Sequence, residues 1–262
     1  MLIEIFGYLA LGIVAGLLGG ILGIGGSVVL IPVLNLIFGF GFHLSQAAAM
    51  TVNPFIAAPA AWEHGRAGYI NWPIFWRCLP SGILFIISAA ILSNYIPAIY
   101  LQFIFGLFLV WVFIDGLVKL VRKRTEVQKN VRDANWWRCS LVGGITGAFS
   151  GLLGIGGGLA TVPLLQKLCG LSLKTAIGTS SAIMILTTTC GALAKNISLS
   201  EKIADGSTVN GLTSISIAVW LIPTGIIGAL IGAHLCHILP NRTVRSLFLI
   251  LVAIAAVKML VP

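Results

Sequence analysis

Long apolar segments separated by short polar stretches recur along the whole chain. Each segment carries few charges, and most approach the roughly 20 residues that a membrane-spanning helix needs. An outer-membrane barrel would instead show alternating apolar and polar positions in strands of about 10 residues, a pattern that the sequence lacks. The pattern predicts an all-α polytopic membrane protein with helices over 2–18, 27–40, 45–62, 73–93, 98–121, 137–153, 158–171, 173–195, 208–236 and 242–261.

These segments form two matching sets. Residues 23–27 read Gly-Ile-Gly-Gly-Ser and residues 154–158 read Gly-Ile-Gly-Gly-Gly, and we call them the first and second glycine phrases. A proline follows each phrase, at Pro32 and Pro163. Such internal similarity predicts two homologous repeats, over 1–124 and 137–262, joined by a basic stretch at 125–136. Each repeat would hold four to five transmembrane segments, one of them a short helix broken by glycine.

The basic residues indicate how the repeats are oriented. Six of the sixteen lysines and arginines lie between Arg122 and Arg138, which predicts a cytoplasmic joint because cytoplasmic loops are rich in these residues. If all five segments of each half cross the membrane, the repeats are inverted. If the short segment only enters and returns, the repeats are parallel. The charge count over the other loops favours the inverted arrangement.

Composition excludes several other classes of protein. The chain has 58% hydrophobic and 9% charged residues, whereas soluble domains are about one quarter charged. The net charge is +9, but the basic residues lie between the apolar segments and do not form one basic face, so we expect no nucleic-acid partner. The first segment lacks a basic leader and a cleavage site, which indicates a retained helix. The cysteines and histidines show no metal-binding spacing, so we expect no metal and no cofactor.

The glycine phrases are the first candidate site. Three glycines within four positions favour a break in the helix, because each costs about 1 kcal/mol relative to alanine. The helix that follows the break then directs unpaired N–H groups and its positive dipole end toward a cavity, where an anion is favoured. This predicts anion binding by the backbone at Gly25, Gly26, Ser27, Gly156, Gly157 and Gly158. The competing interpretation is that these glycines only allow helices to pack closely.

A second pair of matching patches lies in the third segment of each half. Its hydroxyl and amide groups can donate hydrogen bonds to an oxyanion, and they can equally bond neighbouring helices. The residues are Thr51, Asn53, Thr179, Ser180 and Ser181. We find no converging nucleophile, base or metal ligands, and therefore expect no enzyme.

Charged residues near apolar segments are candidates for coupling. Glu63 and His64 end the third segment, and either side chain can take up a proton during transport. The competing interpretation places them at the membrane interface, where they would pair locally or reach the headgroups. The same choice applies to Lys195, which ends the corresponding segment of the second half.

These motifs together resemble the sulfite exporter TauE/SafE family of membrane permeases. The resemblance rests on the two glycine phrases, the Val/Ile-Pro steps at 31–32 and 162–163, and the Ala-Ile-Gly-Thr-Ser patch at 176–180. In the first half that patch reads Ala-Ala-Ala-Met-Thr at 47–51 and departs from the pattern.

The resemblance implies transport, usually export, of sulfur-containing oxyanions such as sulfite or small organosulfonates across the inner membrane. The unpaired N–H groups and positive helix ends at the glycine phrases also favour an anion, independently of the resemblance. A passive anion channel and a permease for another small organic anion remain open, and so does the oligomeric state.

Overall fold

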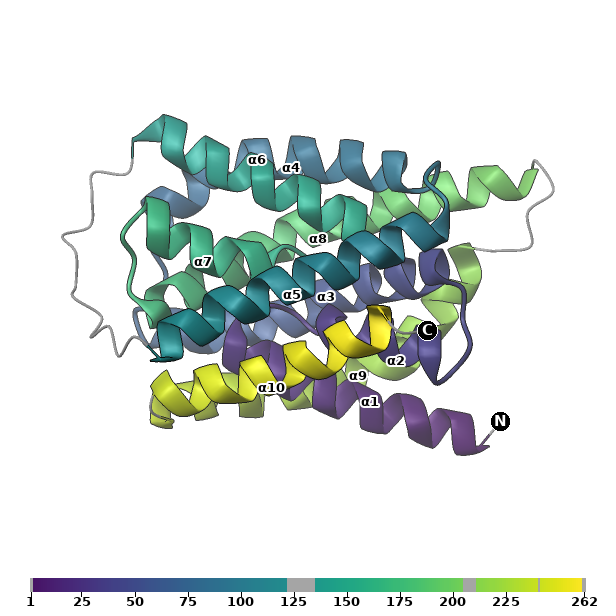
Figure 1. Cartoon of the computed structure of the whole chain (residues 1–262), viewed down its shortest axis with the longest axis horizontal. Coiled ribbons are helices and arrows are strands. Elements are labelled where there is room, and N and C mark those ends of the chain that lie inside the picture. Colours follow the sequence, from purple (N-terminus) through teal and green to yellow (C-terminus); the bar gives the residue numbers. More distant parts are fainter. Residues whose placement is uncertain (1, 122–134, 205–210, 240, 261–262) are drawn as a thin grey trace.

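The part of the chain that the structure describes is built from ten α-helices. This computed structural model describes residues 2–121, 135–204, 211–239 and 241–260. In Figure 1 the helices lie along the long axis of the molecule, and successive helices alternate in direction. They are α1 (Leu2–Leu22), α2 (Ser27–Leu36), α3 (Phe42–Arg66), α4 (Trp72–Ser93), α5 (Ala98–Val121), α6 (Trp136–Leu153), α7 (Gly158–Leu168), α8 (Leu173–Ala204), α9 (Gly211–Ile238) and α10 (Asn241–Leu260).

The ten helices match the ten predicted segments one for one, and the all-helical prediction is confirmed. Five of them, α1, α4, α5, α8 and α9, are long and apolar enough to cross a membrane. Local sequence signals determine where some helices begin. At the N-terminus of α4, the side chain of the N-cap residue Asn71 accepts a hydrogen bond from the Ile74 N–H at 3.1 Å. A proline follows in the first turn of the helix. The chain is therefore a multi-pass membrane protein.

The helices of the two halves interleave. α1 packs along α9, and α4 packs along α6. Glycines make both contacts close: a Cβ at Gly16 would lie 2.1 Å from the carbonyl oxygen of Gly225, and one at Gly147 would lie 2.5 Å from that of Gly82. Small residues of this kind let helix backbones touch, which is a main source of helix association in membranes.

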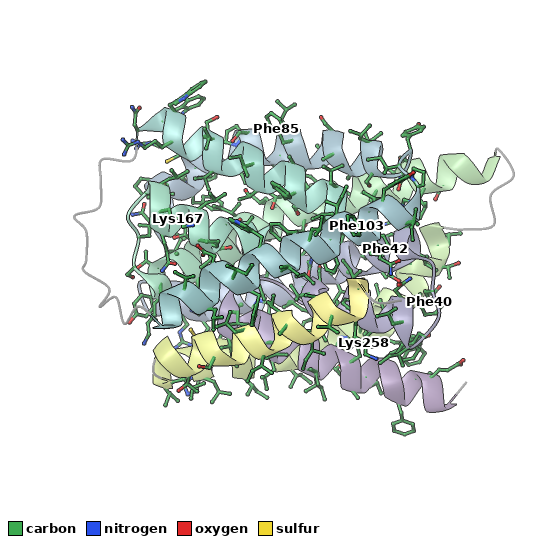
Figure 2. All side chains as sticks on the ribbon, viewed as in Figure 1. Phe40, Phe42, Phe85, Phe103, Lys167 and Lys258 are labelled. Carbon is green, nitrogen blue, oxygen red and sulfur yellow. The ribbon has the colours of Figure 1, made fainter. Side chains whose placement is uncertain are left out.

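α3 and α8 pack against each other between these two pairs, with α3 also against α9 and α8 also against α4. α5 packs against α10, as Figure 1 also shows. Tryptophans 62, 72, 76, 136 and 137 are exposed on the bundle surface. In Figure 2, Lys167 lies at the end of the bundle where α4 and α6 begin, and Lys258 lies toward the other end.

Most of the predicted joint at 125–136 lies outside the described residues. The alternating directions are compatible with inverted repeats, and both the repeat and its inversion stay predictions. The prediction that Lys195 ends its segment is wrong, because α8 continues to Ala204 and leaves Lys195 fully buried.

Candidate functional site

Both glycine phrases break a helix, as predicted. α1 ends at Leu22 and α2 begins at Ser27, whereas α6 ends at Leu153 and α7 begins at Gly158. Five phrase glycines have positive φ angles of 62° to 87°, namely Gly23, Gly25, Gly154, Gly156 and Gly157. Other residues rarely adopt these angles, so the glycines are required by the turn itself and not only by close packing.

The two phrases meet inside the protein. A Cβ at Gly158 would lie 2.3 Å from the Cα of Ile24 and 2.4 Å from the carbonyl oxygen of Gly23, which puts the two backbones in direct contact. Asn53 of α3 lies between the phrases: its side chain would be 2.8 Å from a Cβ at Gly25 and 2.5 Å from one at Gly156. All residues of both phrases are buried.

Asn53 caps the beginning of α2. Its Oδ1 accepts a hydrogen bond from the N–H of Gly26 at 3.0 Å, and its Nδ2 donates to the hydroxyl of Ser27. From α8, the Ser180 hydroxyl donates to the carbonyl oxygen of Gly23 at 3.1 Å. The structure therefore places Asn53 and Ser180 against the glycine phrases.

The other predicted hydroxyls have different contacts. Thr51 donates to the carbonyl oxygen of Ala47 at 2.8 Å and accepts from the Asn196 amide at 3.1 Å. Thr179 accepts from the N–H of Asn71 at 3.0 Å. Ser181 donates to a carbonyl of its own helix, that of Ile177. These contacts are the interhelical and local hydrogen bonds that formed the competing interpretation.

A buried polar cluster beside the second phrase was not predicted. The Lys195 ammonium donates to Gln46 Oε1 at 3.0 Å and to the Ser93 hydroxyl at 2.7 Å, and all three side chains are buried. Gln46 in turn donates to the carbonyl oxygen of Leu152 at 3.0 Å, in the last turn of α6. The signal in the sequence was a lysine in an apolar helix, which is a functional candidate by default.

The predicted coupling residues lie at the other end of α3. Glu63 Oε1 is 3.5 Å from Nδ1 of His234 on α9, a partner that the sequence did not reveal. His64 is fully buried, with Nε2 3.4 Å from the carbonyl oxygen of Gly20 on α1. α3 thus contacts the α1–α9 pair through both residues. Within the described ranges, no three His, Cys, Asp or Glu side chains are grouped so that they could hold a metal ion.

Several relatives of this chain carry the name probable membrane transporter protein. The chain is 27% identical to the probable membrane transporter protein MJ0441 of Methanocaldococcus jannaschii, over 69% of this chain and 68% of that protein. It is 23% identical to the probable membrane transporter protein YdhB of Bacillus subtilis, over 94% of this chain and 96% of that protein.

A third relative is the probable membrane transporter protein MamO of Paramagnetospirillum magneticum, 23% identical over 98% of this chain. The chain spans less than half of the two MamO proteins that it matches, 44% and 45%. No solved structure is significantly similar. The family model described as sulfite exporter TauE/SafE matches residues 8–259, and the chain therefore belongs to this family.

Proposed function

We propose that the protein is a secondary transporter that exports small sulfur-containing oxyanions, such as sulfite or small organosulfonates, across the inner membrane. Family membership and relatives named as probable membrane transporters support transport. The observation that carries the proposal is the meeting of two broken helices: the beginning of α7 lies against the first glycine phrase, which leads into α2.

This arrangement suits an oxyanion for electrostatic reasons. The first N–H groups of a helix have no partner inside it, and the dipole makes this end positive. Glycine lets an oxygen atom approach the backbone closely, and a buried setting strengthens each hydrogen bond. Neutral N–H donors also release an anion more readily than a fixed cation would, as a transport cycle requires.

The interleaved packing supports a mechanism of alternating access. The α1–α9 pair and the α4–α6 pair form two units, with α3 and α8 between them. The first phrase follows α1 and the second follows α6, so rocking of the two units changes the contact between Gly158 and Ile24. Transporters built from repeats commonly work by such rocking around a central site.

Proton coupling is assigned to the end of α3. Glu63 and His234 link α3 to α9, and His64 contacts α1. Loss or gain of a proton at Glu63 or His64 alters contacts between α3 and the α1–α9 unit. A proton gradient therefore acts on the same unit that carries the first glycine phrase.

Flux into proteoliposomes tests the proposal. We expect saturable flux of sulfite or of a small organosulfonate that responds to an imposed pH gradient, with protein-free liposomes as the control. Saturable flux that ignores the gradient would contradict coupling and would indicate a uniporter or channel. No flux of any sulfur oxyanion would contradict the proposed substrate class, and flux of carboxylates alone would assign another organic anion.

A further inference from the structure

The surroundings of the two phrases differ at matching positions. A Cβ at Gly26 would lie 2.7 Å from Cδ1 of Ile56 and 3.1 Å from Cβ of Ala15, so the first phrase is tightly enclosed. At Gly157, which is 131 positions later, the nearest atoms would be Cβ of Ser150 at 3.6 Å, Oγ1 of Thr161 at 3.6 Å and Oγ of Ser150 at 3.7 Å. The second phrase therefore has room for an atom beside its backbone, next to two hydroxyl groups.

The hydrogen bonds around the beginnings of α2 and α7 also differ. At α2, the N–H of Gly26 already donates to Asn53. The N-cap residues of both helices, Gly26 and Gly157, have no side chain that could act as a cap, and the position that matches Asn53 by the spacing of the third segments is Ala182. The hydrogen bonds of the Asn53 amide go to the first phrase, and the second half of the chain has alanine at the matching position.

The buried hydroxyl of Ser150 indicates a ligand at the second phrase. Its side chain is only 2% exposed, and its hydroxyl makes no hydrogen bond with any residue that the structure describes. Buried hydroxyls are normally satisfied, and one that is not lowers stability. The matching position in the first half is Gly19, where a Cβ would lie 2.8 Å from the backbone of Gly25.

Thr161 has a supporting role. Its hydroxyl donates to the carbonyl oxygen of Gly157 at 2.8 Å, which holds this carbonyl within the first turn of α7. The groups left to donate at this point are the Ser150 hydroxyl and the first N–H groups of α7, which have no partner inside the helix.

We propose that the transported oxyanion binds at the N-terminus of α7 and accepts a hydrogen bond from Ser150, while Asn53 occupies the equivalent place at α2. The binding site is then asymmetric: the second phrase holds the substrate, and the first phrase forms part of its wall. This inference rests on the proposed function, and it replaces the symmetric grip that the sequence predicted.

The substitution Ser150→Ala tests this inference, because it should weaken sulfite binding without lowering the thermal stability of the substrate-free protein. Because the hydroxyl has no partner among the residues that the structure describes, the variant without substrate should be as thermally stable as the wild type or more stable. Its KM for sulfite in proteoliposomes should rise about tenfold, equivalent to about 1.4 kcal/mol. Sulfite should stabilise the purified wild type against heat by linkage, and stabilise the variant less at the same concentration.

Ser45→Ala is the matched control. Ser45 is also fully buried, but its hydroxyl donates to the carbonyl oxygen of Gly41 at 3.2 Å, so this variant should keep the wild-type KM. The inference would be overturned if Ser150→Ala kept the wild-type KM, or if it lost much of its thermal stability without substrate. Either result would leave the proposed function standing, provided that the wild type transports a sulfur oxyanion. Absence of sulfur oxyanion flux in the wild type would contradict the proposed function instead.

Discussion

The contact between α4 and α6 gives a sharp prediction from two neighbouring glycines. A Cβ at Gly143 would lie 2.1 Å from the carbonyl oxygen of Cys78, whereas one at Gly144 would lie 3.4 Å from the ring of Phe85. Since C···O contacts normally need about 3.3 Å, Gly143→Ala must push α4 and α6 apart by roughly 1 Å. Overpacking of this kind costs about 1–3 kcal/mol.

The comparison between the two variants isolates that cost. Both gain about 1 kcal/mol from replacing a mid-helix glycine, and this gain cancels in the difference. We therefore expect Gly143→Ala to be less stable than Gly144→Ala by about 1–3 kcal/mol, which is a difference of about 2–12 °C in thermal midpoint for a chain of this size. Thermal unfolding of both proteins in detergent measures it. Equal midpoints would refute the close packing that positions the end of α6 and Ser150.

Three further substitutions test the site. Gly158→Ala should insert normally and lose flux, since its methyl group overlaps the backbone of Ile24; flux like the wild type would show that the phrases do not touch. Glu63→Gln should abolish the response of flux to a pH gradient while anion exchange without a gradient persists, and a retained response would remove Glu63 from coupling. Asn53→Ala should lower thermal stability by about 1–3 kcal/mol, because the buried N–H of Gly26 loses its acceptor, and unchanged stability would refute the cap.

The helices and their breaks were predictable from the sequence because they depend on local properties. Apolar runs fix the number of helices, and clustered glycines fix where α2 and α7 begin, at Ser27 and Gly158. The end of α8 was less predictable. Lys195 reads as a terminus, yet hydrogen bonds to Gln46 and Ser93 from two other helices satisfy it inside the protein.

The candidate site could be predicted only in part, because helix rotation is set by tertiary packing. Asn53 and Thr51 are two residues apart in one helix, and only Asn53 contacts the glycine phrases. His234 and Glu63 are distant in the sequence and meet only through the packing of α3 on α9. Ser150 lies among small residues and resembles a packing position, so its significance depends on the missing hydrogen bond, which only a structure reveals.

Protection of position 150 by substrate is the most direct test of anion binding at the N-terminus of α7. In a Ser150→Cys variant whose five native cysteines are replaced by alanine, the rate of reaction with methyl methanethiosulfonate is measured by mass spectrometry with and without methanesulfonate. We expect methanesulfonate to slow the reaction at position 150 in a saturable way, and to leave the rate unchanged for a cysteine that replaces Ser45 in the same background. A thiol at position 150 that reacts at the same rate with and without the anion would contradict binding at the N-terminus of α7.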